Sequence, residues 1–228
     1  MWNLAKVLFV VVTVGVTTFL GFQERHAGTP TFFFVTLSGT AVFAVYAVYH
    51  LLEAGEVRQR LWIRGGDFTL GTVSAAALFG AAFAFARWVA PLGTPRAGWL
   101  LRVYLQLGDP DVLRKKVALV WIAIALAALA EELVFRYLVP ALLEEKLGSR
   151  YAWIASAGLY SLAHAPTAFA MRRAETGLNP LLPVAALGCG LVWGALARRT
   201  GRLLPSVFSH AIFNVAVVMM FRLYGPSV

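Results

Sequence analysis

The stretch AALAEELVFRYLVPAL, residues 127–142, decides how this chain folds, because it is apolar apart from Glu131, Glu132 and Arg136. A charged side chain in the hydrocarbon of a membrane costs about 2.5–3.5 kcal/mol, so such residues usually face a polar interior and have a function. Glu132 and Arg136 can pair on one helix face, whereas Glu131 points about 100° away. One carboxylate is therefore expected to be structural and the other to be available for chemistry. The alternative is that all three only stabilise helix packing.

The composition indicates an integral membrane protein. Hydrophobic residues make up 60% of the chain and charged residues 14%, with a mean hydropathy of +0.73, whereas a soluble domain is about 25% charged. The net charge of +9 does not predict a nucleic-acid partner, because the Lys and Arg residues flank the apolar runs, as in loops anchored at lipid surfaces. The single cysteine, Cys189, excludes an internal disulfide and a cysteine-rich metal site.

Seven apolar runs approach the length of about 20 residues that a membrane span requires. Lipid cannot satisfy open backbone groups, and the runs lack strict alternation, so helices are predicted. The shorter run 97–107 is predicted to be an interfacial or re-entrant helix. The fold class is therefore an all-α polytopic transmembrane helix bundle of seven to eight spans, in a single domain over residues 1–228. The seven runs are 4–22, 31–52, 68–90, 116–143, 150–169, 179–198 and 204–222.

Two observations concern the first run and the orientation of the bundle. The run 4–22 lacks a small-residue cleavage site and is expected to be retained as a span. Lys and Arg are nearly evenly divided between the two sides of the predicted spans, so the positive-inside rule does not decide the orientation.

Polar groups also occur in other apolar runs. His164 lies in LYSLAHAPTAF, where Pro166 is expected to kink or end the helix. Taken alone, such a histidine is more often a hydrogen-bonded core residue than a catalyst. His210 and Asn214 lie in PSVFSHAIFNVAVVMM on one helix face, and such a pair can hold an oxyanion or bind a metal. His50, near the end of another run, completes the set of chargeable groups at membrane depth.

The depths of these groups favour a single site. Counted along the helices, Glu131, His164 and Asn214 lie ~18, ~21 and ~15 Å from the same membrane face. Helix tilts of about 20° are normal, so these depths are compatible. We expect the polar groups of three spans to converge.

The three motifs together resemble those of the CPBP intramembrane proteases, which include the CAAX prenyl endopeptidases and the bacteriocin-processing Abi group. That family carries Glu-Glu-x-x-x-Arg, then Phe-x-x-x-His, then His-x-x-x-Asn or Asp, on successive helices. The chain has Glu131-Glu132 with Arg136, Tyr160 with His164, and His210 with Asn214. The resemblance covers about residues 116–222, a predicted catalytic core, with residues 1–115 as accessory spans. Tyr160 replaces the family's Phe, and its hydroxyl is in a position to bond to His164.

The resemblance implies an intramembrane endopeptidase that hydrolyses a peptide bond near a membrane-associated terminus. By the same resemblance, Glu131 activates the attacking water and His164 helps to hold it. His210 and Asn214 correspond to the pair that stabilises the oxyanion. The supporting residues are Glu132, Arg136 and Tyr160.

Several alternatives remain open at this level. A glutamate mechanism needs no cofactor and is preferred; the alternative is a zinc ion bound by Glu131, His164 and His210. A non-enzymatic membrane protein, either an ion or proton pathway or an immunity-type protein, is the competing class. The substrate is expected to be a prenylated CAAX tail, a bacteriocin-type peptide or a C-terminal sorting tail. The plasma (inner) membrane of a prokaryote is the expected location.

Overall fold

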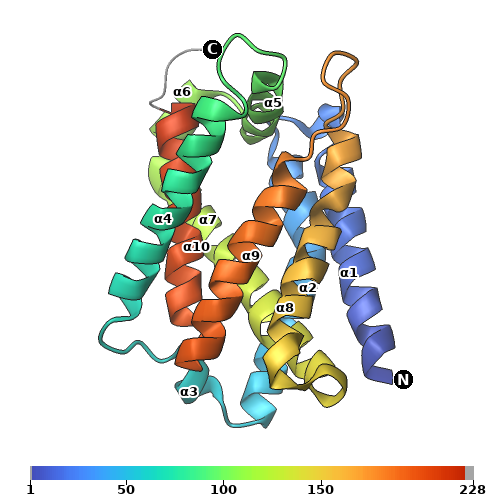
Figure 1. Cartoon of the computed structure of the whole chain (residues 1–228), viewed down its shortest axis with the longest axis vertical. Coiled ribbons are helices and arrows are strands. Elements are labelled where there is room, and N and C mark those ends of the chain that lie inside the picture. Colours follow the sequence, from blue (N-terminus) through green and yellow to red (C-terminus); the bar gives the residue numbers. More distant parts are fainter. Residues whose placement is uncertain (1, 224–228) are drawn as a thin grey trace.

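The computed structural model describes residues 2–223, and the regular elements of that part of the chain are helices (Figure 1). The predicted all-α class is confirmed. The long helices are α1 (Trp2–Gly21), α2 (Pro30–Glu53), α4 (Asp67–Trp88), α7 (Val117–Glu132), α8 (Val139–Ala170), α9 (Leu181–Thr200) and α10 (Leu204–Val217). The short helices are α3 (Val57–Leu61), α5 (Ala97–Leu107) and α6 (Pro110–Lys115), with a 3-10 turn η1 (Glu24–His26) and two π-helices, η2 (Leu133–Leu138) and η3 (Val218–Leu223).

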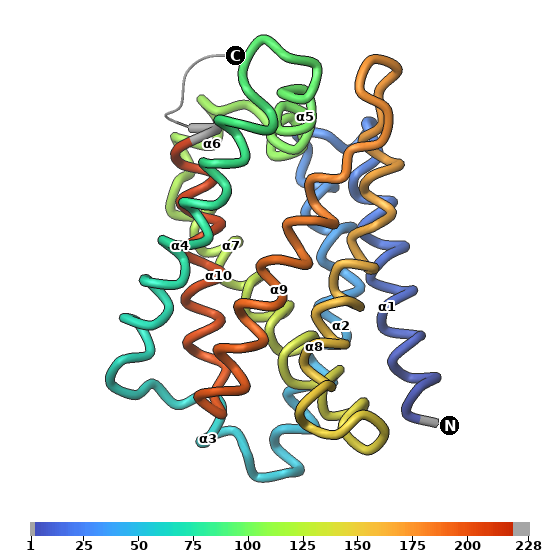
Figure 2. Tube along the Cα trace, viewed as in Figure 1, coloured from blue at the N-terminus to red at the C-terminus, as the bar shows by residue number. Residues whose placement is uncertain are grey.

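The apolar helices coincide with the predicted runs. In the described residues, five helices are long and apolar enough to cross a membrane, and one of these continues from Val117 to Ala170. Gly148 interrupts it with non-helical angles (φ 67°, ψ 159°). Figure 2 shows the yellow part of the trace turning back at the lower end of the bundle, so this stretch is two antiparallel helices. The apolar helix 204–220 is shorter than the other five. The number of spans, seven or eight, stays a prediction.

The long helices form two groups (Figure 1). Helices α4, α7 and α10 pack on one side, and α1, α2, α8 and α9 on the other. The π-helix η2 contacts α2, α7, α8 and α9 and so joins the two groups. On α4, a Cβ added to Gly71 would lie 2.6 Å from Cβ of Phe208 and 3.1 Å from the backbone N of Ser209. Small residues of this kind allow helices to approach closely in lipid.

The most completely buried segment is the one that joins the two groups. Every residue from 132 to 139 is buried, whereas Glu131 is partly exposed. Cys189 is also buried in this core and acts in packing, as its small apolar neighbours indicated. The centre of the fold is therefore the π-helix; of the predicted motif residues, Arg136 lies within it and Glu132 directly precedes it.

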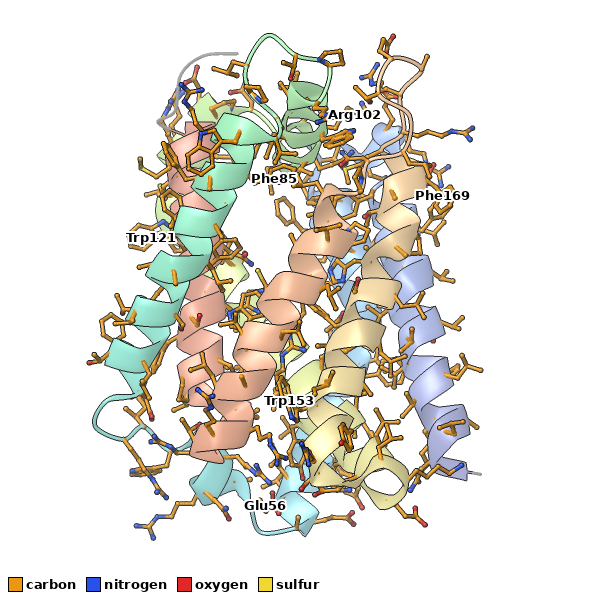
Figure 3. All side chains as sticks on the ribbon, in the orientation of Figure 1. Glu56, Phe85, Arg102, Trp121, Trp153 and Phe169 are labelled. Carbon is orange, nitrogen blue, oxygen red and sulfur yellow. The ribbon has the colours of Figure 1, made fainter. Side chains whose placement is uncertain are left out.

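Polar contacts close the two ends of the bundle. At the lower end, Asp67 at the start of α4 is fully buried and pairs with Arg202 in the α9–α10 turn, with Nη1 and Oδ1 2.6 Å apart. At the upper end, α5 has the bounds predicted for the short helix, and its Arg102 pairs with Glu24 at 3.2 Å (Figure 3). Helices α1, α2 and α4 of the first 115 residues pack onto α8, α7 and α10, respectively. The boundary between accessory spans and core stays a prediction.

Candidate active site

Glu132 lies at the end of α7, and its carboxylate is fully buried. Its Oε2 is 3.4 Å from Nε of Arg136, which forms the predicted ion pair. Its Oε1 is 3.0 Å from Nδ1 of His210. Because a buried charge is tolerated only when it is paired and hydrogen-bonded, these two contacts explain how Glu132 is accommodated in the core.

The ring of His210 is held by its surroundings. It stacks on the indole of Trp193 from α9, with centroids 3.7 Å apart and planes at 16°. The indole Nε1 of Trp193 donates to Oγ of Ser209 (3.0 Å), and that hydroxyl is also hydrogen-bonded to Ser74 on α4 (2.9 Å). The orientation of His210 is therefore set by three other helices, α4, α7 and α9.

A single imidazole lies between the two adjacent glutamates. Nδ1 of His210 faces Glu132, and Nε2 lies 4.0 Å from Oε2 of Glu131. With Nδ1 donating to the carboxylate of Glu132, Nε2 is an acceptor in the neutral ring and a donor in the protonated ring. The side chain of Glu131 is 18% exposed and that of Glu132 is 0% exposed, so Glu131 is the more accessible of the two carboxylates.

The hydroxyl of Tyr160 donates to Oε2 of Glu131 over 2.5 Å. The prediction that this hydroxyl bonds to His164 was wrong. The tyrosine ring lies under the guanidinium of Arg136, 4.7 Å from its centroid, and its hydroxyl reaches across to α7. Nδ1 of His164 instead donates to the backbone carbonyl of Tyr160 at 2.9 Å, because that carbonyl lies one helical turn before it.

His164 and Asn214 are farther from the centre of the site. The ring of His164 lies edge-on to Tyr160, with centroids 4.6 Å apart. Helix α8 continues beyond Pro166 to Ala170. Asn214 lies one turn after His210 on α10 and is half-buried, and its side chain makes no hydrogen bond to another described residue. His210 and the two glutamates are thus in direct contact range. The parts that His164 and Asn214 have in the site stay predictions.

His50 belongs to a different cluster. Its Nδ1 is 2.8 Å from the hydroxyl of Tyr137, on the π-helix. The guanidinium of Arg60 lies over the same ring at 5.7 Å. His50 therefore anchors α2 to the π-helix and does not join the glutamates.

The alternative to a glutamate mechanism is a zinc ion bound by Glu131, His164 and His210. Within residues 2–223 no group of three or more His, Cys, Asp or Glu side chains is placed to hold a metal. Nδ1 of His210 is bonded to Glu132 and Nδ1 of His164 to a backbone carbonyl, which leaves Nε2 of each ring as the atom that could bind a metal. The zinc ion bound by Glu131, His164 and His210 stays an alternative prediction.

Sequence reasoning did not single out Trp193, Ser209 or Ser74, although they hold the ring of His210. A weak signal existed for Trp193, since it lies between Gly190 and Gly194. A Cβ added to these glycines would lie 3.3 Å from Tyr160 and 3.0 Å from Trp153, so α8 and α9 approach closely there.

Comparison with known proteins finds a match to a family model over just under half of the chain. Residues 113–216, from α6 to α10, match a family described as Rce1-like, type II CAAX prenyl endopeptidase Rce1-like. The matched residues contain all three motifs, from Glu131 to Asn214. No curated protein and no solved structure matches the chain. The resemblance drawn from the motifs is confirmed, since the residues that carry them match the model of Rce1-like type II CAAX prenyl endopeptidases.

Proposed function

We propose that the chain is an intramembrane endopeptidase in which Glu131 activates the attacking water. The match to this family model supports a protease of the CAAX type that acts on a membrane-associated peptide or protein. The observation that carries the glutamate assignment is the position of His210, between the buried Glu132 at 3.0 Å and the accessible Glu131 at 4.0 Å.

Glu131, Glu132 and Arg136 together carry one net negative charge when both carboxylates are ionised, and the ring of His210 lies between the two carboxylates. The form with a protonated ring and an ionised Glu131 has both an acid and a base ready, and Glu132 stabilises that ring.

In the proposed reaction, a water lies within hydrogen-bond reach of Glu131 and Nε2 of His210. Glu131 takes a proton from the water as its oxygen attacks the peptide carbonyl carbon. The Nε2–H group of His210 donates to the oxyanion, and Asn214 offers a second donor one turn away. The C–N bond then breaks as Glu131 returns the proton to the leaving amine. His164, on α8, helps to hold the water.

The test is the variant Glu131→Gln, which keeps the shape of the side chain but cannot accept a proton. Purified protein is incubated with membrane-anchored peptides that carry a prenylated CAAX tail, a bacteriocin-type leader or a C-terminal sorting tail, and products are identified by mass spectrometry. Cleavage should fall at least about 100-fold, the lower end for loss of a general base. Glu144→Gln, at an exposed position of α8, is the matched control. Unchanged cleavage by the Glu131 variant would refute the assignment.

Two finer points belong to the same proposal. The metal-free mechanism predicts that protein purified with a chelator and free of zinc by metal analysis keeps its activity. The plasma membrane of a prokaryote is the proposed location, and fractionation of cells that express the chain tests it. The choice among the three substrate classes follows from which peptide is cut.

A further inference from the structure

The hydroxyl of Tyr160 donates a hydrogen bond of 2.5 Å to Oε2 of Glu131, the proposed general base. The contact joins the middle of α8 to the end of α7, so it is a tertiary contact between residues 29 positions apart. A phenylalanine at this position would pack equally well but would leave Glu131 without this donor.

The ring of Tyr160 cannot easily turn away from this contact. It is 4% exposed, and the guanidinium of Arg136 lies over it at 4.7 Å. The ring of Phe135 packs against it with centroids 4.9 Å apart, and that of His164 lies edge-on at 4.6 Å. On the α9 side, Gly190 approaches so closely that an added Cβ would lie 3.3 Å from the tyrosine ring. Arg136, held by Glu132, thus fixes the ring, and the ring fixes the hydroxyl.

The two polar contacts of the Glu131 carboxylate fall on the same oxygen. Tyr160 donates to Oε2, and Nε2 of His210 lies 4.0 Å from Oε2. Oε1 makes no hydrogen bond to another described residue, and the side chain is partly exposed. A hydroxyl anchored on Oε2 therefore determines the rotation of the carboxylate and leaves Oε1 to face the accessible space.

We propose that Tyr160 is a positioning residue, whose hydroxyl holds Oε2 of Glu131 so that Oε1 takes the proton from the attacking water. This inference rests on the proposed function, because it assumes that Glu131 is the base. It assigns to Tyr160 a role in the reaction in addition to its place in the packing around Arg136. The hydroxyl acts through Glu131 and does not touch the substrate.

The test compares Tyr160→Phe with Tyr137→Phe. Both changes remove one hydroxyl from a ring in the core, but the hydroxyl of Tyr137 bonds to His50 outside the site. For Tyr160→Phe, kcat should fall about 10- to 100-fold, the range for loss of a hydrogen bond to a charged group, while KM stays within twofold. For Tyr137→Phe, kcat should stay within about twofold. The thermal midpoints in detergent show whether either variant is folded.

A second measurement separates positioning from a structural effect. Glu131→Asp shortens the side chain, so its carboxylate no longer reaches the hydroxyl. In that background Tyr160→Phe should change kcat less than about threefold, because the coupled contact is already lost. An equal loss in both backgrounds would overturn the proposed role.

The outcomes also distinguish this inference from the proposed function. If Glu131→Gln is inactive while Tyr160→Phe keeps full kcat, the positioning role is wrong and the protease assignment stands. If Glu131→Gln keeps full activity, both are wrong.

Discussion

Helix α7 above Glu131 and the segment 132–139 below it are continuous in sequence but lie in opposite surroundings. In α7, the large apolar side chains Leu119, Trp121, Ile122 and Leu126 are exposed, and Figure 3 shows Trp121 projecting away from the bundle. From Glu132 to Val139 every residue is buried. Such exposed apolar faces fit a lipid surface, since lipid is as apolar as these side chains. The two glutamates lie where the exposed part of α7 meets the buried segment. The carboxylates of these neighbouring residues therefore have different surroundings.

The largest predicted difference in the free energy of unfolding is between Glu132→Ala, in the buried segment, and Glu131→Ala, at its edge. The first leaves Arg136 buried without its anion and should lower the free energy of unfolding by about 3–5 kcal/mol. The second removes a partly exposed side chain and should cost less than about 1.5 kcal/mol, the contribution of a typical hydrogen bond. Thermal unfolding in detergent micelles measures both. Equal losses would mean that the burial difference at Glu131 and Glu132 has no energetic meaning.

A smaller loss of stability is expected for a substitution on α4 where that helix packs on α10. Gly71→Ala places a Cβ 2.6 Å from Phe208 and should cost about 1–3 kcal/mol through overpacking. Gly80→Ala is the matched control, because an added Cβ there meets nothing within 4 Å. The control should be neutral or slightly stabilising, since alanine favours helices over glycine. If the two alanine variants unfold at the same temperature, α4 is not closely packed at Gly71.

The loss of stability caused by Ser74→Ala is expected to be smaller again. It removes the hydrogen bond to Ser209, worth about 1 kcal/mol, and releases one support of the Trp193–His210 stack. Cleavage should fall a few-fold, although Ser74 lies outside residues 113–216. Ser38→Ala, whose hydroxyl bonds only within α2, should leave cleavage unchanged. Identical rates for the two variants would show that α4 does not influence the site.

The smallest effect is expected on the lipid-facing side. Trp121→Ala should change the free energy of unfolding by no more than about 0.5 kcal/mol, as for other exposed positions. Trp193→Ala removes a fully buried indole and should cost about 3–5 kcal/mol. A large loss at Trp121 would indicate that the exposed face of α7 is covered by another protein surface.

The sequence predicted the helices because their signals are local. The apolar length, the turn residues and the spacing of Glu132 and Arg136 depend on neighbouring residues alone, and the structure agrees with them. The contacts of Glu132 with His210 and of Tyr160 with Glu131 join distant helices. They depend on how each helix is rotated about its axis, which the sequence pattern does not give. The expected Tyr160–His164 bond was wrong for this reason.

The π-helix Leu133–Leu138 immediately after the glutamates is wider than an α-helical turn and contains one more residue per hydrogen-bonded ring. If the same residues formed ordinary α-helix instead, Glu131 and Glu132 would rotate by about 100°, the turn of one residue, relative to Val139 and the helix beyond. A chain wound in that way would retain every side chain of the site and lose their mutual orientation. In this turn, the winding of the backbone therefore orients the site as much as the identity of the residues does.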